Sequence, residues 1–258
     1  GGDAEGSRER FRVFERNTRN ALIALLSEPT SRYPHAVLGD DLEAGRIVIV
    51  DPATDEVVGN ITIPEPAVIE GIAAPWVDVD GDGVQELLVT VSDSAGGARL
   101  IVYALSGEVI AEGPPIGLGN RWRNQLGVAP IGPDGGIEVV DIRVPHIGGV
   151  VEFFTLDGSA LSRLAEQPGF TSHGIGSRNL DLALIADVTG DGALDVVAPS
   201  QDRGELGVLT RTGDGAEIAG TLDLPGRLSS NLATATAGDA VWLAAGTTNG
   251  ILRIYTGR

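Results

Sequence analysis

Residues 182–225 read LALIADVTGDGALDVVAPSQDRGELGVLTRTGDGAEIAGTLDLP, and this stretch decides the fold. It holds four apolar runs, LALIAD, ALDVVAP, ELGVLTR and AEIAGTLDL, separated by Gly, Asp, Ser and Pro. Short runs rich in Val, Ile and Leu and bounded by turn residues are typical of strands. The stretch therefore predicts a small antiparallel sheet of four strands.

The same pattern recurs along the chain. A second copy from residue 72 reads IAAPWVDVD, VQELLVTV, ARLIVYAL and EVIAEGPPI, and a degenerate copy follows it with QLGVAPI, GIEVVDIRV, GVVEFFTL and SRLAEQ. The first copy reads ALIALLSE, PHAVLGD, GRIVIVD and EVVGNITI, and the last contains only LATATA, AVWLAAG and ILRIYTG. A period of roughly 20–50 residues indicates a repeat architecture such as a propeller.

The incomplete last copy suggests how the ends of the chain meet. The segment RFRVFERN at 10–17 belongs to no copy, and as an outer strand of the last one it would close a ring without exposed sheet edges. We therefore predict an all-β protein: a flexible N-terminus at 1–9 and one β-propeller domain at 10–258, with five four-stranded blades and 10–17 as the closing strand. The expected blades span approximately 19–66, 70–118, 122–170, 177–225 and 229–257.

An asparagine precedes the first strand of four of these units, at Asn20, Asn124, Asn179 and Asn231. Asn side chains commonly hydrogen-bond to backbone in turns, and we expect that role here. A ring of functional Asn and Arg side chains on one face is the alternative.

The charge of the chain is strongly negative. Thirty-six Asp and Glu residues oppose eighteen basic residues, all of them arginine, for a formal net charge of −18. Phosphate recognition needs clustered Lys and Arg, so this balance argues against nucleic acid and anionic lipid surfaces as partners. No apolar stretch reaches the roughly 20 residues that span a bilayer, and we expect no membrane insertion. An acidic chain suits divalent cations, and the alternative is that the charge serves solubility alone.

Two turns between first and second strands share an acidic pattern: DVDGDGVQE at 78–86 and DVTGDGALD at 187–195. Ca²⁺ takes six to eight oxygen ligands at about 2.3–2.6 Å, and alternating carboxylates in a tight turn can converge on one ion. The glycines permit the sharp turn. Positions one, three and five would offer side-chain oxygens, position seven a carbonyl and position nine a closing carboxylate. Threonine at position three predicts weaker binding in the second loop, and the alternative for both loops is an Asp/Gly turn without an ion.

With this repeat and these loops, the chain resembles the FG-GAP/VCBS repeats of integrin-α-like β-propellers. The likeness covers most of the chain as architecture but only the two loops as a motif, and the Phe-Gly…Gly-Ala-Pro signature is absent. It implies calcium sites that stiffen the ring and a role in adhesion, ligand binding or assembly outside the cell. The implied ligands are Asp78, Asp80, Asp82, Val84 and Glu86 in the first loop and Asp187, Thr189, Asp191, Ala193 and Asp195 in the second.

Catalytic or sugar-binding residues are scarce in the sequence. Glycosidases place two carboxylates about 5–9 Å apart, and the channel-facing strands offer mainly Glu28, Asp181 and Asp187. Trp122 is the best candidate for an exposed sugar platform, whereas Trp76 and Trp242 lie within strands and are expected in the core.

The histidines His35, His146 and His173 lack metal-binding spacing, so each is expected to be a loop or core residue. His173 forms a polar cluster with Arg178 and Asn179 in the sequence, and we expect this cluster at the mouth of the channel.

We therefore predict a non-enzymatic, calcium-binding β-propeller with two Ca²⁺ sites. It would work outside the cytoplasm (periplasmic, cell-surface or secreted) as a protein-binding, adhesion or scaffolding module. The alternative is a carbohydrate-active five-bladed propeller, either a glycosidase or a lectin, although no aromatic pocket repeats from unit to unit.

Overall fold

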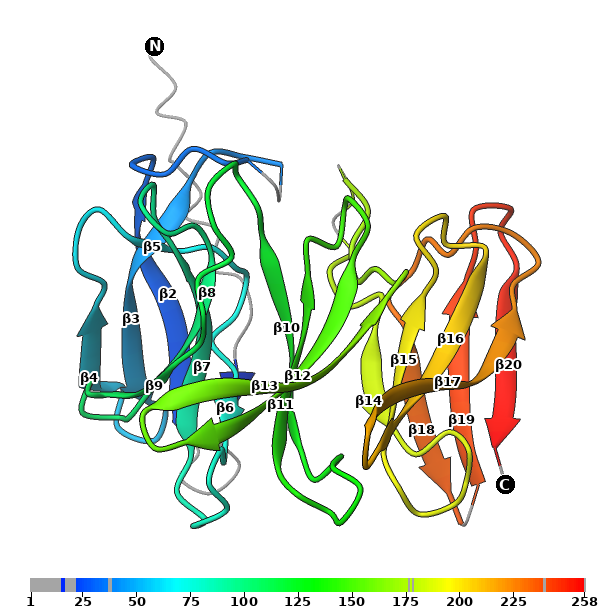
Figure 1. Cartoon of the computed structure of the whole chain (residues 1–258). Coiled ribbons are helices and arrows are strands. Elements are labelled where there is room, and N and C mark those ends of the chain that lie inside the picture. The colour runs from blue at the N-terminus through cyan, green and yellow to red at the C-terminus, as the bar shows by residue number, and fades with distance from the viewer. Residues whose placement is uncertain are drawn as a thin grey trace.

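The computed structural model describes residues 15–16, 22–36, 39–175, 177, 179–238 and 240–257. These residues form strands and turns, and no helix occurs among them. This part of the chain accordingly contains no membrane-spanning helix. The predicted all-β class is confirmed, and the sheets follow one another across the molecule in a propeller-like arrangement (Figure 1).

The strands form consecutive antiparallel groups along the chain. The first group is β1 (Glu15–Arg16), β2 (Ile23–Thr30), β3 (Glu43–Asp51) and β4 (Glu56–Thr62). The next is β5 (Val68–Ile69), β6 (Trp76–Val77), β7 (Glu86–Ser92), β8 (Arg99–Tyr103) and β9 (Val109–Glu112), where β5 also pairs with β3. Then come β10 (Arg123–Ala129), β11 (Glu138–Arg143), β12 (Val150–Asp157) and β13 (Ala160–Pro168). The fourth group is β14 (Leu184–Ala186), β15 (Asp195–Pro199), β16 (Glu205–Thr212) and β17 (Gly215–Asp223). The fifth group is β18 (Ala233–Ala237), β19 (Ala240–Gly246) and β20 (Leu252–Gly257).

The first group differs from the prediction. The segment PHAVLGD was expected to form a strand, but its described residues form a loop. Pro34 lacks the N–H that a strand ladder requires, and Ala36 has a positive φ of 52°. Glu15 and Arg16 instead pair with β2, at Ala24 and Ile23. They therefore contribute to the first group rather than, as predicted, to the last.

Hydrophobic clusters join each group to the next because strand residues alternate between the two faces of a sheet. Val139 of β11 faces the preceding group, together with Leu88 and Phe154, whereas its neighbour Val140 packs with Phe153 toward the following group. Val196 and Val197 of β15 divide in the same way between the clusters on either side. The core is thus a series of layers between sheets.

A buried ion-pair network lies within the β10–β13 group. Arg123 Nη1 lies 2.6 Å from Asp141 Oδ2 and 2.8 Å from Glu152 Oε2, and all three residues are buried. Burial raises the pKa of Asp141 to about 6, against the opposing effect of Arg123. Glu152 also pairs with Arg143 and Arg163; despite its burial, Arg123 first and then these two arginines hold its pKa below the usual value. Removal of the Arg123 charge would leave Asp141 without its ion-pair partner, whereas Glu152 would keep Arg143 and Arg163.

The expected ring closure does not appear in the part of the chain that the structure describes. The β18–β20 sheet lies at the opposite end of the row from β2–β4 (Figure 1), and β20 pairs only with β19 among the described residues. The remaining residues of the predicted closing strand, 10–14 and 17, lie outside that part, as does the predicted N-terminal segment 1–9. Every residue of β18 is exposed, and Trp242, predicted in the core, is 42% exposed because no described sheet covers its face.

The predicted asparagine contacts connect neighbouring groups. Asn124 donates to Leu180 O at 3.3 Å and to Ser172 Oγ at 2.7 Å, and the Asn179 side chain donates to the Ser229 carbonyl. Asn231 accepts from the Asp181 N–H at 3.3 Å. These three side chains bond to the backbone as predicted, but they do so across the boundary between two groups. Asn20 lies outside the described residues.

Candidate metal site

The first acidic loop is the turn between β6 and β7. It begins at Asp78, directly after β6, and ends at Glu86, the first residue of β7. Gly81 and Gly83 have φ values of 77° and 87°, in the left-handed region that favours glycine. A side-chain Cβ at Gly81 would also lie only 2.9 Å from Ile137 Cδ1 of the following group. The glycines therefore permit both the turn and its contact with the neighbouring sheet.

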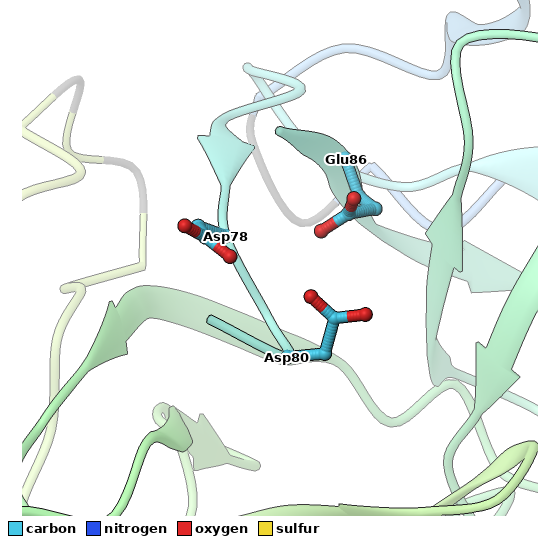
Figure 2. Close-up of side chains that lie close together, drawn as sticks. All are labelled: Asp78, Asp80 and Glu86. Atoms are coloured by element: carbon cyan, nitrogen blue, oxygen red, sulfur yellow. The ribbon is translucent and has the colours of Figure 1, made fainter. Parts of the chain in front are cut away.

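Three carboxylates of this loop converge. One oxygen from each of Asp78, Asp80 and Glu86 lies within 4.8 Å of the other two, and Figure 2 shows the three side chains around a common space. Oxygens bound to one Ca²⁺ at about 2.4 Å lie at most about 4.8 Å apart, so the spacing fits a shared ion. No other group of three His, Asp or Glu side chains meets this criterion among the described residues.

The electrostatics of the loop also favour a cation. Glu86 is buried, and desolvation raises its pKa, with further contributions from the charges of Asp80, Asp82 and Asp78 and an opposing hydrogen bond from Val79 N–H. The Oδ1 atom of Asp78 is buried and has no hydrogen-bond partner. A buried carboxylate oxygen without a partner is costly. A bound cation would satisfy that oxygen and offset the repulsion among the carboxylates.

The other two predicted ligands of this loop are placed differently. Asp82 is exposed and is not one of the three converging carboxylates; its Oδ1 accepts a 2.6 Å hydrogen bond from the Val84 N–H. The Val84 side chain is exposed as well, and a ligand role for its carbonyl stays a prediction.

The second acidic loop, between β14 and β15, is closed by hydrogen bonds within the protein. Asp195 Oδ2 accepts from Thr189 Oγ1 at 3.1 Å, and Asp195 Oδ1 accepts from Thr210 Oγ1 at 2.7 Å. Both oxygens of Asp187 accept from backbone N–H groups, at Gly190 and Gly192. The hydroxyl that was expected to serve as a neutral ligand thus donates to the closing carboxylate.

Accordingly, the carboxylate oxygens of Asp187, Asp191 and Asp195 do not converge within 4.8 Å of one another, as those of the first loop do. A site formed by the predicted ligands Asp187, Thr189, Asp191, Ala193 and Asp195 remains a prediction.

Trp122 is not the exposed platform that was expected. It is only 3% exposed, and its Nε1–H donates to the Glu70 carbonyl at 2.8 Å. Its ring stacks on His146 with centroids 5.8 Å apart. The aromatic candidate for sugar stacking therefore belongs to the interior.

Sequence reasoning missed the association of the histidines. His146 Nε2 lies 2.5 Å from His173 Nδ1, and His35 lines the same cavity as His146. Loops distant in sequence bring these residues together, so their spacing carries no signal. His173 itself is buried, and the cluster predicted with Arg178 falls partly outside the described residues.

No protein-family model matches the sequence, and no curated protein does. Among solved structures, BBS1N in complex with ARL6DN shares 17% identity and a TM-score of 0.49, over 94% of this chain and 63% of that one. The chain thus spans less than two thirds of the BBS1N chain.

Two further solved structures are similar at the same level. A protein of unknown function from Bacteroides caccae shares 12% identity and a TM-score of 0.43, over 82% of this chain and 69% of that one. Rhamnogalacturonan lyase YesW shares 16% identity and a TM-score of 0.45, over 80% and 49%. Matches at these identities and scores assign no activity, ligand or partner to this chain.

Proposed function

We propose that this protein is a calcium-binding, propeller-like module that binds protein partners outside the cytoplasm and has no enzymatic activity of its own. The observation that carries the proposal is the convergence of Asp78, Asp80 and Glu86 around one space. The unpartnered Asp78 Oδ1 supports it independently, because a buried carboxylate oxygen calls for a donor or a cation.

The ion would act on stability rather than on chemistry. The loop follows a short strand and contacts Ile137 of the next group, so an ion there would hold β6, β7 and the neighbouring sheet in one arrangement. Ions that bind the folded state and not the unfolded one stabilise it by mass action. The second loop would bind more weakly, since its hydroxyl and its closing carboxylate already bond to each other.

The binding role rests on the scaffold. The groups of strands are the proposed five blades, and layered packing between them makes a rigid support for their loops. Loops on rigid scaffolds commonly carry recognition. The charge of −18 disfavours nucleic acid as the partner. Calcium is plentiful outside cells, where moderate-affinity sites of this kind are filled.

The test is a thermal melt of the full chain in EDTA and in millimolar Ca²⁺. At 100-fold excess over the dissociation constant, one ion adds about 2.7 kcal/mol, which corresponds to roughly 5–10 °C for a chain of this size. Asp78→Asn should remove most of this shift. Asp134→Asn, in the corresponding turn of the β10–β13 group, is the matched control and should keep it. An identical melting point with and without Ca²⁺ would reduce the loop to an ordinary turn.

A further inference from the structure

Two histidines, His35 and His146, line one cavity, which lies apart from the acidic loops. The cavity measures about 330 Å³ and is lined by His35 and His146 together with Asn120, Trp122, Ile147 and Ile175. His173 lies behind His146, with its Nδ1 2.5 Å from His146 Nε2. The chain contains three histidines in total: two line this cavity, and the third contacts one of those two.

The hydrogen bonds of His173 define which of its nitrogens is free. Its Nε2 lies 2.9 Å from the Ser177 carbonyl oxygen. A carbonyl only accepts hydrogen bonds, so Nε2 must carry the proton. In the neutral ring, Nδ1 then presents its lone pair toward His146. Metal-binding histidines are commonly oriented in this way, with the second nitrogen donating to a carbonyl or carboxylate.

One ring nitrogen of His35 also has a fixed hydrogen-bond partner, as Nε2 of His173 does. Its Nδ1 contacts the carboxylate of Glu70, a fully buried side chain that also accepts from the Ser92 hydroxyl. The Glu70 carbonyl accepts from Trp122 as described above, so one residue holds both His35 and the indole on which His146 stacks. The surroundings of the imidazoles are thus fixed by a buried hydrogen-bonded network.

We propose that His146 Nε2 and His173 Nδ1 bind a transition-metal ion of the zinc class at the wall of this cavity. Zn²⁺ holds imidazole nitrogens at about 2.0–2.1 Å in tetrahedral geometry, which separates them by roughly 3.3 Å. The pair would open by less than about 1 Å to admit the ion. The proton that His146 Nε2 now shares with His173 would move to His146 Nδ1, so that both lone pairs point at the metal.

Ligand chemistry separates this site from the acidic loops. Imidazole nitrogens suit Zn²⁺, Ni²⁺ and Cu²⁺, whereas Ca²⁺ prefers oxygen. With two protein ligands, the ion would keep further coordination positions, which water or an oxygen or nitrogen donor of a small ligand would fill.

The experiment is a calorimetric titration of the full, chelator-stripped chain with Zn²⁺, in millimolar Ca²⁺ to occupy any oxygen sites. We expect one Zn²⁺ per chain at the histidine pair and at least a tenfold weaker affinity in His146→Gln. Asp78→Asn should titrate as the wild type does. Cu²⁺ should quench the fluorescence of Trp122, which stacks on His146, and the quenching should be lost in His146→Gln.

A measurement on the wild type avoids dependence on the fold of a variant. In ¹H–¹⁵N spectra of the imidazoles, Zn²⁺ should shift the signals of His146 Nε2 and His173 Nδ1. Unchanged imidazole spectra, or a His146→Gln titration equal to that of the wild type, would overturn the proposal. Because Zn²⁺ and not Ca²⁺ is the probe, this result is independent of the calcium-dependent melting behaviour.

Discussion

Glu86→Gln should stabilise the calcium-free protein and weaken calcium binding at the same time. The substitution preserves the size of the side chain and the oxygen that accepts the Val79 N–H at 3.1 Å. It removes a buried negative charge whose pKa is raised by desolvation and by Asp80, Asp82 and Asp78. A purely structural carboxylate would instead lose stability on this change.

The magnitude follows from the geometry of the loop. Two like charges 4 Å apart repel by about 4 kcal/mol at an effective dielectric constant of 20. The repulsion here is smaller, because Asp80 and Asp82 are exposed to water. We therefore expect Glu86→Gln to raise the free energy of unfolding by about 1 kcal/mol, equivalent to roughly 2–4 °C in melting temperature for a chain of this size. The calcium-dependent shift should fall below half of the wild-type value.

The assay is scanning calorimetry of the wild type and Glu86→Gln, each in EDTA and in Ca²⁺. Glu56→Gln, at the exposed first residue of β4, is the control; it should change neither the calcium-free melting temperature nor the calcium-dependent shift. The pKa of Glu86 is higher in the folded state than in the unfolded state. Without Ca²⁺, the free energy of unfolding of the wild type should therefore rise as the pH falls from the folded-state pKa to the unfolded-state pKa, and fall again as the pH rises. Glu86→Gln should flatten this dependence. A calcium-free Glu86→Gln protein that melts below the wild type, with an undiminished Ca²⁺ shift, would refute the reasoning.

Three further predictions concern stability. Arg123→Met should cost about 3–5 kcal/mol in urea unfolding, because it leaves the buried Asp141 carboxylate without its ion-pair partner; a loss under about 1 kcal/mol, as expected for a surface ion pair, would contradict this. Burial raises the pKa of Glu43 to about 9 in the folded state. The protonated side chain therefore contributes fully to the free energy of unfolding below the pKa of Glu43 in the unfolded chain, and this contribution is lost as the pH rises toward 9. Glu43→Gln should therefore match the wild type near pH 4 and exceed it at pH 9, and parallel profiles would show that the group titrates normally. Gly81→Ala should destabilise by more than about 1 kcal/mol, given its positive φ and the close Ile137 contact; Gly213→Ala, which meets no atom within 4 Å, is the control and should not.

The repeat was predictable from sequence because each unit contains the same series of short apolar runs separated by turn residues. Runs such as ELLVTV and VVEFF have apolar residues at consecutive positions, as expected for strands covered on both faces. The convergence of Asp78, Asp80 and Glu86 was predictable because these carboxylates come from one short turn, so their spacing in sequence fixes their spacing in space.

Features that depend on distant segments were not predictable in this way. Trp242 has the pattern of a core residue, and its exposure reflects the absence of a covering sheet among the described residues. Trp122 lies between two arginines in sequence, but the fold places it against Glu70, a residue of the preceding group. Glu15 and Arg16 pair with Ala24 and Ile23 of the first group, and the sequence pattern of the last unit gave no sign of this.

The order of the strands separates the two candidate metal sites. Antiparallel neighbours run in opposite directions, so turns between first and second strands emerge at one end of the sheets, and the connections on either side of them emerge at the other end. Both acidic loops belong to the first kind, between β6 and β7 and between β14 and β15. His146 follows β11, and His173 follows β13, so both belong to the second kind. An ion in the first acidic loop would brace the sheets at one end and leave the cavity at the opposite end open. Calcium should therefore alter the melting temperature without competing for the histidine pair, and zinc should bind with equal affinity whether or not calcium is present.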